Sequence, residues 1–263
     1  MLPRTENCGK WLQCFGVLLM SLPISFLRPF AARFAQYGKF GQAALVDQVC
    51  TSLRNDKRNP YPIPVGGSNV IGTWGYVAGV NELMAQLGET EQIDNVVFAT
   101  GSGGTLAGIT IGLQLYYRHC SRIPAPTIHA VGVCDDPDYF YNMLEKIGEA
   151  MGLSANMNTF REWVQIHQGK ALGYAVSTPE EMEFIQQFAR CTGIVLDPVY
   201  SGKALYHFIN LMKENPEQYR NSKVLFWHTG GSLGIYERDN ELMASLKDTS
   251  RVQRLDVYGK LST

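Results

Sequence analysis

The chain has 263 residues, of which 45% are hydrophobic and 18% are charged, and its formal net charge is −1. This composition is typical of a globular protein with one large or two modest domains, and it provides no basic surface for nucleic acid. The six cysteines lack CxxC pairing and the five histidines lack HExxH spacing. We therefore expect reduced thiols in an intracellular compartment, cytoplasmic or mitochondrial, and no metal site.

The first 34 residues differ in composition from the rest of the chain. Residues 15-FGVLLMSLPISFL-27 form an apolar run of about thirteen residues, shorter than the roughly 20 that cross a bilayer, and Pro23 interrupts it. Four basic residues and one acid surround the run, so a targeting peptide stays open beside a buried or misplaced segment. We expect an atypical N-terminal segment over residues 1–34 that packs irregularly, and no membrane partner.

From Gly41 onward, helical and strand patterns alternate. Residues 42–55 place apolar side chains at helical spacing, and Pro60, Pro62 and Pro64 then require an extended passage. Further helices are predicted at about 70–87, 105–118, 138–150, 179–191 and 202–214, and strands at 96–99, 127–133 and 223–228. Because strands that alternate with such helices are joined by right-handed crossovers, we predict an α/β fold with an open, mainly parallel sheet and helices on both faces.

Two of the predicted strands are strongly apolar, and we expect both to be interior strands of the sheet. These are 96-VVFA-99 and 223-KVLFWH-228. The loops that follow them, Thr100–Thr105 and His228–Gly231, should then open on one edge of the sheet. Ligands of parallel α/β sheets bind at that edge.

The stretch 96-VVFATGSGGTLAG-108 passes from a strand through four glycines into a predicted helix. Glycines let backbone amides converge on one point, and the following helix adds its positive dipole end, so the favoured ligand is a phosphate. A Walker loop is excluded, because Ile109 stands where that motif needs lysine. Leu106 weakens a dinucleotide fingerprint, but Asp135 and Asp136 could still bind a ribose. A nucleotide-binding oxidoreductase and a turn without any ligand therefore stay open.

Five motifs in the chain occur in an order that resembles one family. They are 64-PVGGSNVIGTWGY-76, 100-TGSGGTLAG-108, 173-GYAVSTPEEMEF-184, 195-VLDPVYSGKALY-206 and 226-FWHTGGSLGIY-236. Together they resemble the D-cysteine desulfhydrases, especially the plant-type members, which belong with the aminocyclopropane-carboxylate deaminases among the tryptophan-synthase-β-like enzymes of fold type II. The resemblance covers roughly residues 35–240. It implies pyridoxal 5'-phosphate as the cofactor, a small amino acid such as D-cysteine as the substrate, and a possible homodimer.

The resemblance also implies roles for individual residues. The cofactor phosphate would be held by amides and hydroxyls of Thr100, Gly101, Ser102, Gly103, Gly104 and Thr105. Thr229 matches the position whose hydroxyl faces the pyridine nitrogen of the cofactor. Tyr174 and Tyr200 match two active-site tyrosines that relay protons or orient the substrate carboxylate, and they are the catalytic candidates.

Ser201 separates two branches of the family. The deaminases place a glutamate here that protonates the pyridine nitrogen, and serine cannot supply a carboxylate. Because thiolate is a good leaving group, Ser201 together with Thr229 favours β-elimination of D-cysteine to pyruvate, ammonia and hydrogen sulfide. Deamination of 1-aminocyclopropane-1-carboxylate is the alternative.

The GGNK-type segment of the family, whose lysine forms the Schiff base with the cofactor, does not occur in the chain, and neither does its QSNH-type segment. We therefore expect that the first half of the family domain, with most of its small domain, is missing or replaced by residues 1–34. Residues 35–263 would form a partial pyridoxal-phosphate-binding α/β domain without an assigned catalytic lysine. The expected activity is weak or absent, and a non-catalytic remnant that acts as a binding or scaffold protein is a further alternative.

Overall fold

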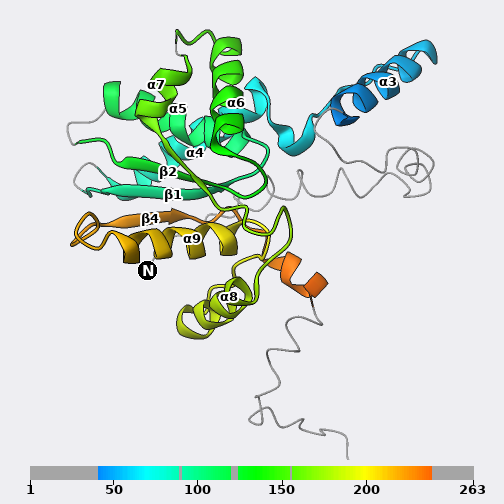
Figure 1. The fold of residues 1–263 in the computed structure, drawn as a ribbon. Helices are drawn as coiled ribbons and strands as arrows, with labels where there is room; N and C mark the ends of the chain where they lie inside the picture. Colours follow the sequence, from blue (N-terminus) through cyan, green and yellow to red (C-terminus); the bar gives the residue numbers. More distant parts are fainter. Residues whose placement is uncertain (1–40, 89–90, 120–123, 155, 239–263) are drawn as a thin grey trace, which may run out of the picture. The chain divides into compact units, whose positions relative to one another are not determined.

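The computed structural model describes residues 41–88, 91–119, 124–154 and 156–238 (Figure 1). The chain divides into two compact units, Met1–Val65 and Gly66–Thr263. The predictions about residues 1–34 lie outside the described residues. None of the described helices is long and apolar enough to cross a membrane.

In the first unit, the described residues form the helix α3 (Gly41–Asn55) and the stretch that follows it. Lys57 adopts a left-handed φ of 58°, and the amides of Asp56 and Arg58 donate to carbonyls of the last helical turn. The three prolines that follow cannot donate hydrogen bonds, so the chain leaves the helix without regular structure. The predicted helix over 42–55 is confirmed.

The second unit is built on a parallel sheet of four described strands. They are β1 (Asn95–Thr100), β2 (Thr127–Gly132), β3 (Gln165–Gln168) and β4 (Val224–Trp227). The order across the sheet is β3-β2-β1-β4, and each neighbouring pair is parallel. This confirms the predicted fold class.

Helices cover both faces of this sheet (Figure 1). On one face lie α4 (Val70–Leu87), α5 (Gly104–His119), α6 (Pro137–Ala150) and α7 (Met157–Trp163). On the other lie α9 (Ser201–Glu214), which packs on the strands, and α8 (Pro179–Thr192), which packs on α9. Alternation along the strands assigns the faces, because Val96 and Phe98 of β1 enter the α4–α7 core whereas Val97 and Ala99 meet α9.

Several helices of this unit begin at recognisable capping residues, and α8 also ends at one. Asn69 and Asp136 accept hydrogen bonds from the first turns of α4 and α6, and Thr178 forms a capping box with Glu181 at α8. Gly193, with φ of 76°, ends α8. The five helices predicted for this unit are confirmed, and their observed boundaries differ from the predicted ones by at most about one residue.

Two elements were not predicted, and one prediction about the sheet was wrong. The short helix α7 and the polar strand β3 carry little apolar periodicity and escaped the pattern. The segment 223–228 was expected inside the sheet, but β4 lies at an edge of the four described strands and its residues are half-buried. Its apolar side chains pack into the cores on both faces of the sheet. The apolar composition therefore indicates that helices cover both faces of the strand. It does not indicate that another strand lies on each side of it. Two short 3₁₀ turns, Val65–Gly67 and Ser232–Arg238, complete the described structure.

Candidate active site

The loops that follow β1 and β4 lie at the same edge of the sheet. The two strands are parallel neighbours, with Phe98 in register with Trp227, so their carboxyl ends point the same way. Thr100–Thr105 and His228–Gly231 therefore open on one edge, as predicted. In open α/β sheets, ligands bind in the crevice outside these strand ends.

The glycine loop joins β1 to α5, and Gly104 is the first residue of that helix. Gly103 has a φ of 93°, a conformation that favours glycine. The first amides of an α-helix have no intrahelical partner and lie at its positive dipole end. Gly103 and Gly104 are buried, whereas Gly101, Ser102 and Thr105 are half-buried. An anion at this loop would lie at the positive end of the α5 dipole.

Ser68 is hydrogen-bonded to the glycine loop, although it was not among the predicted site residues. Its Oγ accepts from the Gly104 amide at 2.9 Å and donates to Ser102 Oγ at 2.8 Å. Because Ser68 precedes the Asn69 cap of α4, the beginnings of α4 and α5 meet at this loop. Ser68 belongs to the motif 64-PVGGSNVIGTWGY-76, and that motif was the available signal for it.

Thr100 ends β1 and is almost fully buried. Its backbone oxygen accepts from the Val133 amide at 3.0 Å, but within the described part of the chain its Oγ1 has no hydrogen-bond partner. Buried hydroxyls in folded proteins are normally paired. The Thr100 hydroxyl therefore has capacity for a ligand oxygen or a water molecule at the start of the glycine loop.

The two predicted catalytic tyrosines contact each other. Their hydroxyl oxygens are 2.7 Å apart, and their rings pack edge to face with centroids 6.0 Å apart. The Tyr200 ring also lies against the glycine loop, because a Cβ added at Gly101 would be 2.8 Å from Tyr200 Cε1. The structure thus brings Tyr174, Tyr200 and Gly101 into one place.

The environment keeps the Tyr200 hydroxyl protonated. Burial, followed by the hydrogen bond with Tyr174, raises the pKa of Tyr200 well above its ordinary value. Tyr174 is 52% exposed and lies on the solvent side of the pair. The pair can therefore hold a proton at the Tyr200 oxygen and exchange one with a ligand through the Tyr174 oxygen.

A buried carboxylate fixes the turn that carries Tyr200. Asp197 Oδ1 accepts from the amides of Val199 and Tyr200 at 2.9 and 2.7 Å. Its Oδ2 accepts from the amide and the hydroxyl of Ser201 at 2.7 and 2.6 Å, and Ser201 Oγ accepts from the Asp197 amide at 2.8 Å. Ser201 is buried, and its hydroxyl is hydrogen-bonded within this turn. Asp197 was not predicted as a site residue, because its role depends on the folded turn.

The loop after β4 packs against the same turn. A Cβ added at Gly231 would lie 3.1 Å from Asp197 Cγ. The Gly230 amide donates to His228 Nδ1 at 3.0 Å, which leaves the proton on Nε2, and Nε2 donates to the Val195 carbonyl at 3.1 Å. Thr229 lies in this loop and is exposed. Its predicted place opposite the pyridine nitrogen stays a prediction.

The two aspartates that left a nucleotide site open form local hydrogen bonds. Asp136 Oδ1 accepts from the Tyr139 amide at 2.8 Å and caps α6, and Asp135 Oδ1 accepts from the Asp136 amide at 3.0 Å. A ribose-binding carboxylate has to face its ligand instead. Among the residues that the structure describes, no group of three or more His, Cys, Asp or Glu side chains is placed to hold a metal ion.

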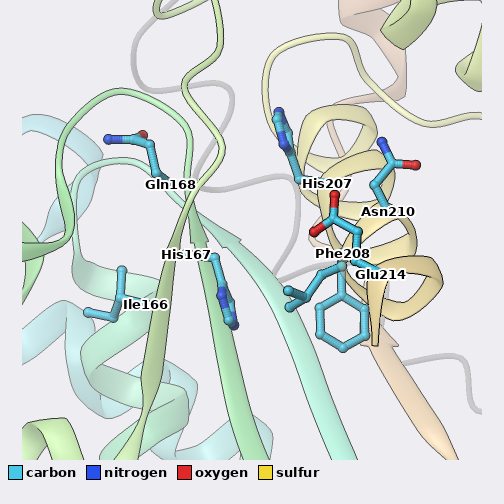
Figure 2. Close-up of a pocket in the computed structure, with 8 residues that line it drawn as sticks. Ile166, His167, Gln168, His207, Phe208, Asn210 and Glu214 are labelled. Carbon is cyan, nitrogen blue, oxygen red and sulfur yellow. The ribbon is translucent and has the colours of Figure 1, made fainter. Parts of the chain in front are cut away.

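A separate pocket of about 480 Å³ lies between β3 and α9 (Figure 2). Its polar lining comes from His167 and Gln168 on the strand and from His207, Asn210 and Glu214 on the helix. None of the predicted site residues lines it. The features that suit a phosphate are at the glycine loop, where backbone amides and the hydroxyls of Thr100 and Ser102 gather beside the tyrosine pair.

Comparison with known proteins adds an independent finding. A family model described as pyridoxal-phosphate dependent enzyme matches residues 25–230. The chain is 42% identical over 235 residues to the mitochondrial bifunctional D-cysteine desulfhydrase/1-aminocyclopropane-1-carboxylate deaminase of Arabidopsis thaliana, covering 86% of this chain and 56% of the relative. It is 37% identical over 188 residues to a putative 1-aminocyclopropane-1-carboxylate deaminase of Thermotoga maritima, covering 70% and 55%.

The structure is similar to the crystal structure of an ACC deaminase homologue. The TM-score is 0.66 at 29% sequence identity, and the match covers 80% of this chain and 61% of that chain. The chain thus spans about half the length of the curated relatives that it matches.

Proposed function

Because the chain belongs to the family of pyridoxal-phosphate dependent enzymes, we propose that its glycine loop binds the phosphate of that cofactor. Thr100, Gly101, Ser102, Gly103, Gly104 and Thr105 would hold it, through backbone amides at the start of α5 and through hydroxyls. The buried hydroxyl of Thr100, which has no hydrogen-bond partner among the described residues, supports this assignment. Thr229 would face the pyridine nitrogen from the loop after β4.

The observation that carries the proposal is the contact between the Tyr200 ring and Gly101. It places an anion-binding loop beside two hydroxyl groups that share a hydrogen bond. A phosphate on the loop would anchor a cofactor whose reactive part lies within reach of groups that hold and move protons. A glycine loop alone would support only a phosphate site.

In the proposed reaction, D-cysteine and water give pyruvate, ammonia and hydrogen sulfide. When bound, pyridoxal phosphate supplies an electron sink for the carbon that loses its proton. The residues of this chain would bind and orient. Tyr200 keeps its proton at the hydroxyl oxygen because of its raised pKa, and the more exposed Tyr174 would orient the substrate carboxylate or exchange a proton with the substrate.

Ser201 favours elimination over ring opening. Its hydroxyl is engaged by Asp197, and a serine supplies no carboxylate to protonate the pyridine nitrogen. Deamination of 1-aminocyclopropane-1-carboxylate is the second candidate, since the name of the Arabidopsis relative includes both activities. Comparing the turnover of the two substrates in a chain that also carries GGNK-type and QSNH-type segments would separate the candidates.

We expect weak or no turnover by the chain itself, because neither of those segments occurs in its sequence. If the folded chain does not bind the cofactor, the alternative function is that of a non-catalytic binding or scaffold protein. The partial domain over 35–263 and the homodimer also stay predictions. An intracellular location, cytoplasmic or mitochondrial, is our proposal, and the relative described as mitochondrial supports it.

Two matched threonine variants test the cofactor site. Thr100 and Thr110 are both buried, and within the described residues neither Oγ1 has a hydrogen-bond partner, but Thr110 lies inside α5, after the loop. Thr100→Val should weaken the binding of pyridoxal phosphate about tenfold, because it removes one ligand hydroxyl without a change of shape. Thr110→Val should leave the affinity unchanged. Equal effects of the two variants, measured by fluorescence titration, would contradict the proposal.

A further inference from the structure

Lys203 is a buried lysine in the first turn of α9, three residues after Tyr200. Its side chain is 0% exposed, and its Nζ lies 3.2 Å from Glu181 Oε2. Burial opposes the ionisation of Glu181, but the neighbouring His207 and the hydrogen bonds from the Thr178 amide and Lys203 outweigh it and lower the pKa of Glu181. A buried ion pair loses hydration that its attraction only partly returns, so stability alone does not account for it.

The second partner of Lys203 is the turn before Tyr174. Lys203 Nζ donates to the Lys170 carbonyl at 3.2 Å, and the Gly173 amide donates to the same carbonyl at 3.0 Å. That carbonyl closes the turn from Lys170 to Gly173, and Tyr174 is the next residue. The lysine therefore connects the helix that follows one tyrosine to the turn that precedes the other.

The partner carboxylate belongs to a third segment. Glu181 Oε2 accepts from the Thr178 amide at 2.8 Å, and Thr178 Oγ1 accepts from the Glu181 amide at 3.2 Å, so this carboxylate also caps α8. On its other side, His207 Nε2 lies 3.3 Å from Glu181 Oε1, and His207 lines the pocket of Figure 2. The Lys203 ammonium thus joins α9, the α8 cap and the turn before Tyr174.

The backbone around Tyr174 depends on external support. Ala171 and Ala175 have left-handed φ angles of 48° and 60°, which cost energy for residues with a side chain. Such a conformation persists where the surroundings hold it. Ser177 Oγ adds one tie by donating to the Pro198 carbonyl at 2.8 Å, and Lys203 adds the tie at Lys170.

We propose that Lys203 is a positioning residue that holds Tyr174 at hydrogen-bond distance from Tyr200. Its ammonium fixes the turn before Tyr174 relative to the first turn of α9, and Glu181 fixes the ammonium. The inference rests on the proposed function in one respect, namely that the tyrosine pair serves the reaction. Small displacements of such groups lower turnover strongly, so a clamp at this point has a catalytic consequence.

The test uses a neutral replacement of the pair, Lys203→Met with Glu181→Gln. Glutamine is also suited to the capping box of α8, and the double change leaves no unpaired buried charge. Lys223→Met is the matched control, because it removes a lysine from an exposed pair with Glu91, at the amino end of β4 and remote from the strand ends that form the site. Both variants are studied in the full chain.

The main readout is the titration of Tyr200 in the chain without cofactor, followed by NMR of labelled tyrosine rings and assigned with Tyr200→Phe. Loss of the clamp should separate the hydroxyls, so the pKa of Tyr200 should be lower in the double variant than in the parent chain. The affinity for pyridoxal phosphate should stay within about twofold, because the glycine loop is a different segment. Lys223→Met should change neither quantity.

Two outcomes would overturn the inference. One is an unchanged Tyr200 titration in the double variant. The other is a changed titration together with a loss of both stability and affinity for pyridoxal phosphate, because that result would indicate a general disturbance of the fold. If the double variant does not fold, Lys203→Met alone, in which Glu181 keeps its contacts with the Thr178 amide and His207, should also lower the pKa of Tyr200, and no change there would overturn the inference. If the parent chain binds no pyridoxal phosphate but the titration moves as expected, the proposed function fails and the clamp stands.

Discussion

On the glycine-loop side of the candidate site, α4 and α5 approach so closely that a Cβ at Gly108 would lie 2.3 Å from Tyr76 Cβ. On the tyrosine side, buried polar groups hold the backbone: the Asp197 carboxylate fixes the turn that carries Tyr200, and the Lys203 ammonium connects α9 to the turn before Tyr174. Close packing excludes added atoms, whereas a polar network is sensitive to changes of charge and hydrogen bonding. The stability of the glycine-loop side should therefore depend on side-chain volume, and that of the tyrosine side on polarity.

The largest expected effect is on the stability of the glycine-loop side. Gly108→Ala should destabilise the fold by about 3 kcal/mol, because the new methyl group meets Tyr76 Cβ and, at 2.7 Å, the Thr73 carbonyl oxygen. Gly75→Ala in α4 is the control, since its Cβ would have no atom within 4 Å, and it should stabilise by about 0.5 to 1 kcal/mol. Denaturant unfolding measures both. A loss of stability in the control equal to that in Gly108→Ala would contradict the difference between the two positions.

The next effect comes from a histidine between the sheet and α9. His129 is fully buried, with Nδ1 at 2.9 Å from His167 Nε2 and Nε2 at 3.0 Å from Asn95 Oδ1. Burial and then the neighbouring His167 lower the pKa of His129 to about 4. Below pH 6.5 the unfolded chain binds a proton that the folded chain excludes. The free energy of unfolding should therefore fall by about 2 to 3 kcal/mol between pH 6.5 and pH 4.

Unfolding midpoints recorded across that pH range provide the measurement. In His129→Gln this part of the pH dependence should disappear, while His119→Gln, at an exposed position near the end of α5, should retain it. A parent chain with equal stability at pH 4 and pH 6.5 would show that His129 is not excluded from protonation in the fold.

The smallest of the three effects separates Asp197 on the tyrosine side from Asp136 at the start of α6. Asp197→Asn should cost about 2 kcal/mol, because an amide group would replace an oxygen that accepts hydrogen bonds from backbone amides. Asp136→Asn should be nearly neutral, since asparagine caps helices as well as aspartate does. Similar losses in both variants would mean that the Asp197 turn is no more than an ordinary cap.

The sequence predicted well those parts of the fold whose signals are local. Asn69, Thr178 and Gly193 mark helix ends with their own chemistry, and apolar periodicity identified three of the four described strands. The polar strand 165-QIHQ-168 carries no such pattern, so β3 was missed. The edge position of β4 was missed because apolar composition reveals cover on the faces of a strand and not its neighbours in the sheet.

The candidate site shows the same limit. The motifs led to the glycine loop and to both tyrosines, and the structure brings Gly101, Tyr174 and Tyr200 together. The groups that support them, Ser68 and Lys203, act on residues 34 and 33 positions away in the chain. Hydrogen bonds over such separations depend on the folded arrangement, and a local pattern contains no record of them.

The most direct test of the central claim is an amide NMR titration of the chain with pyridoxal phosphate. If the glycine loop binds the cofactor phosphate, the amide signals of Gly103, Gly104 and Thr105 should shift most and saturate together, and inorganic phosphate should shift the same signals more weakly. Saturating shifts at His167 and His207 in the pocket between β3 and α9, with unchanged signals at the loop, would contradict the account.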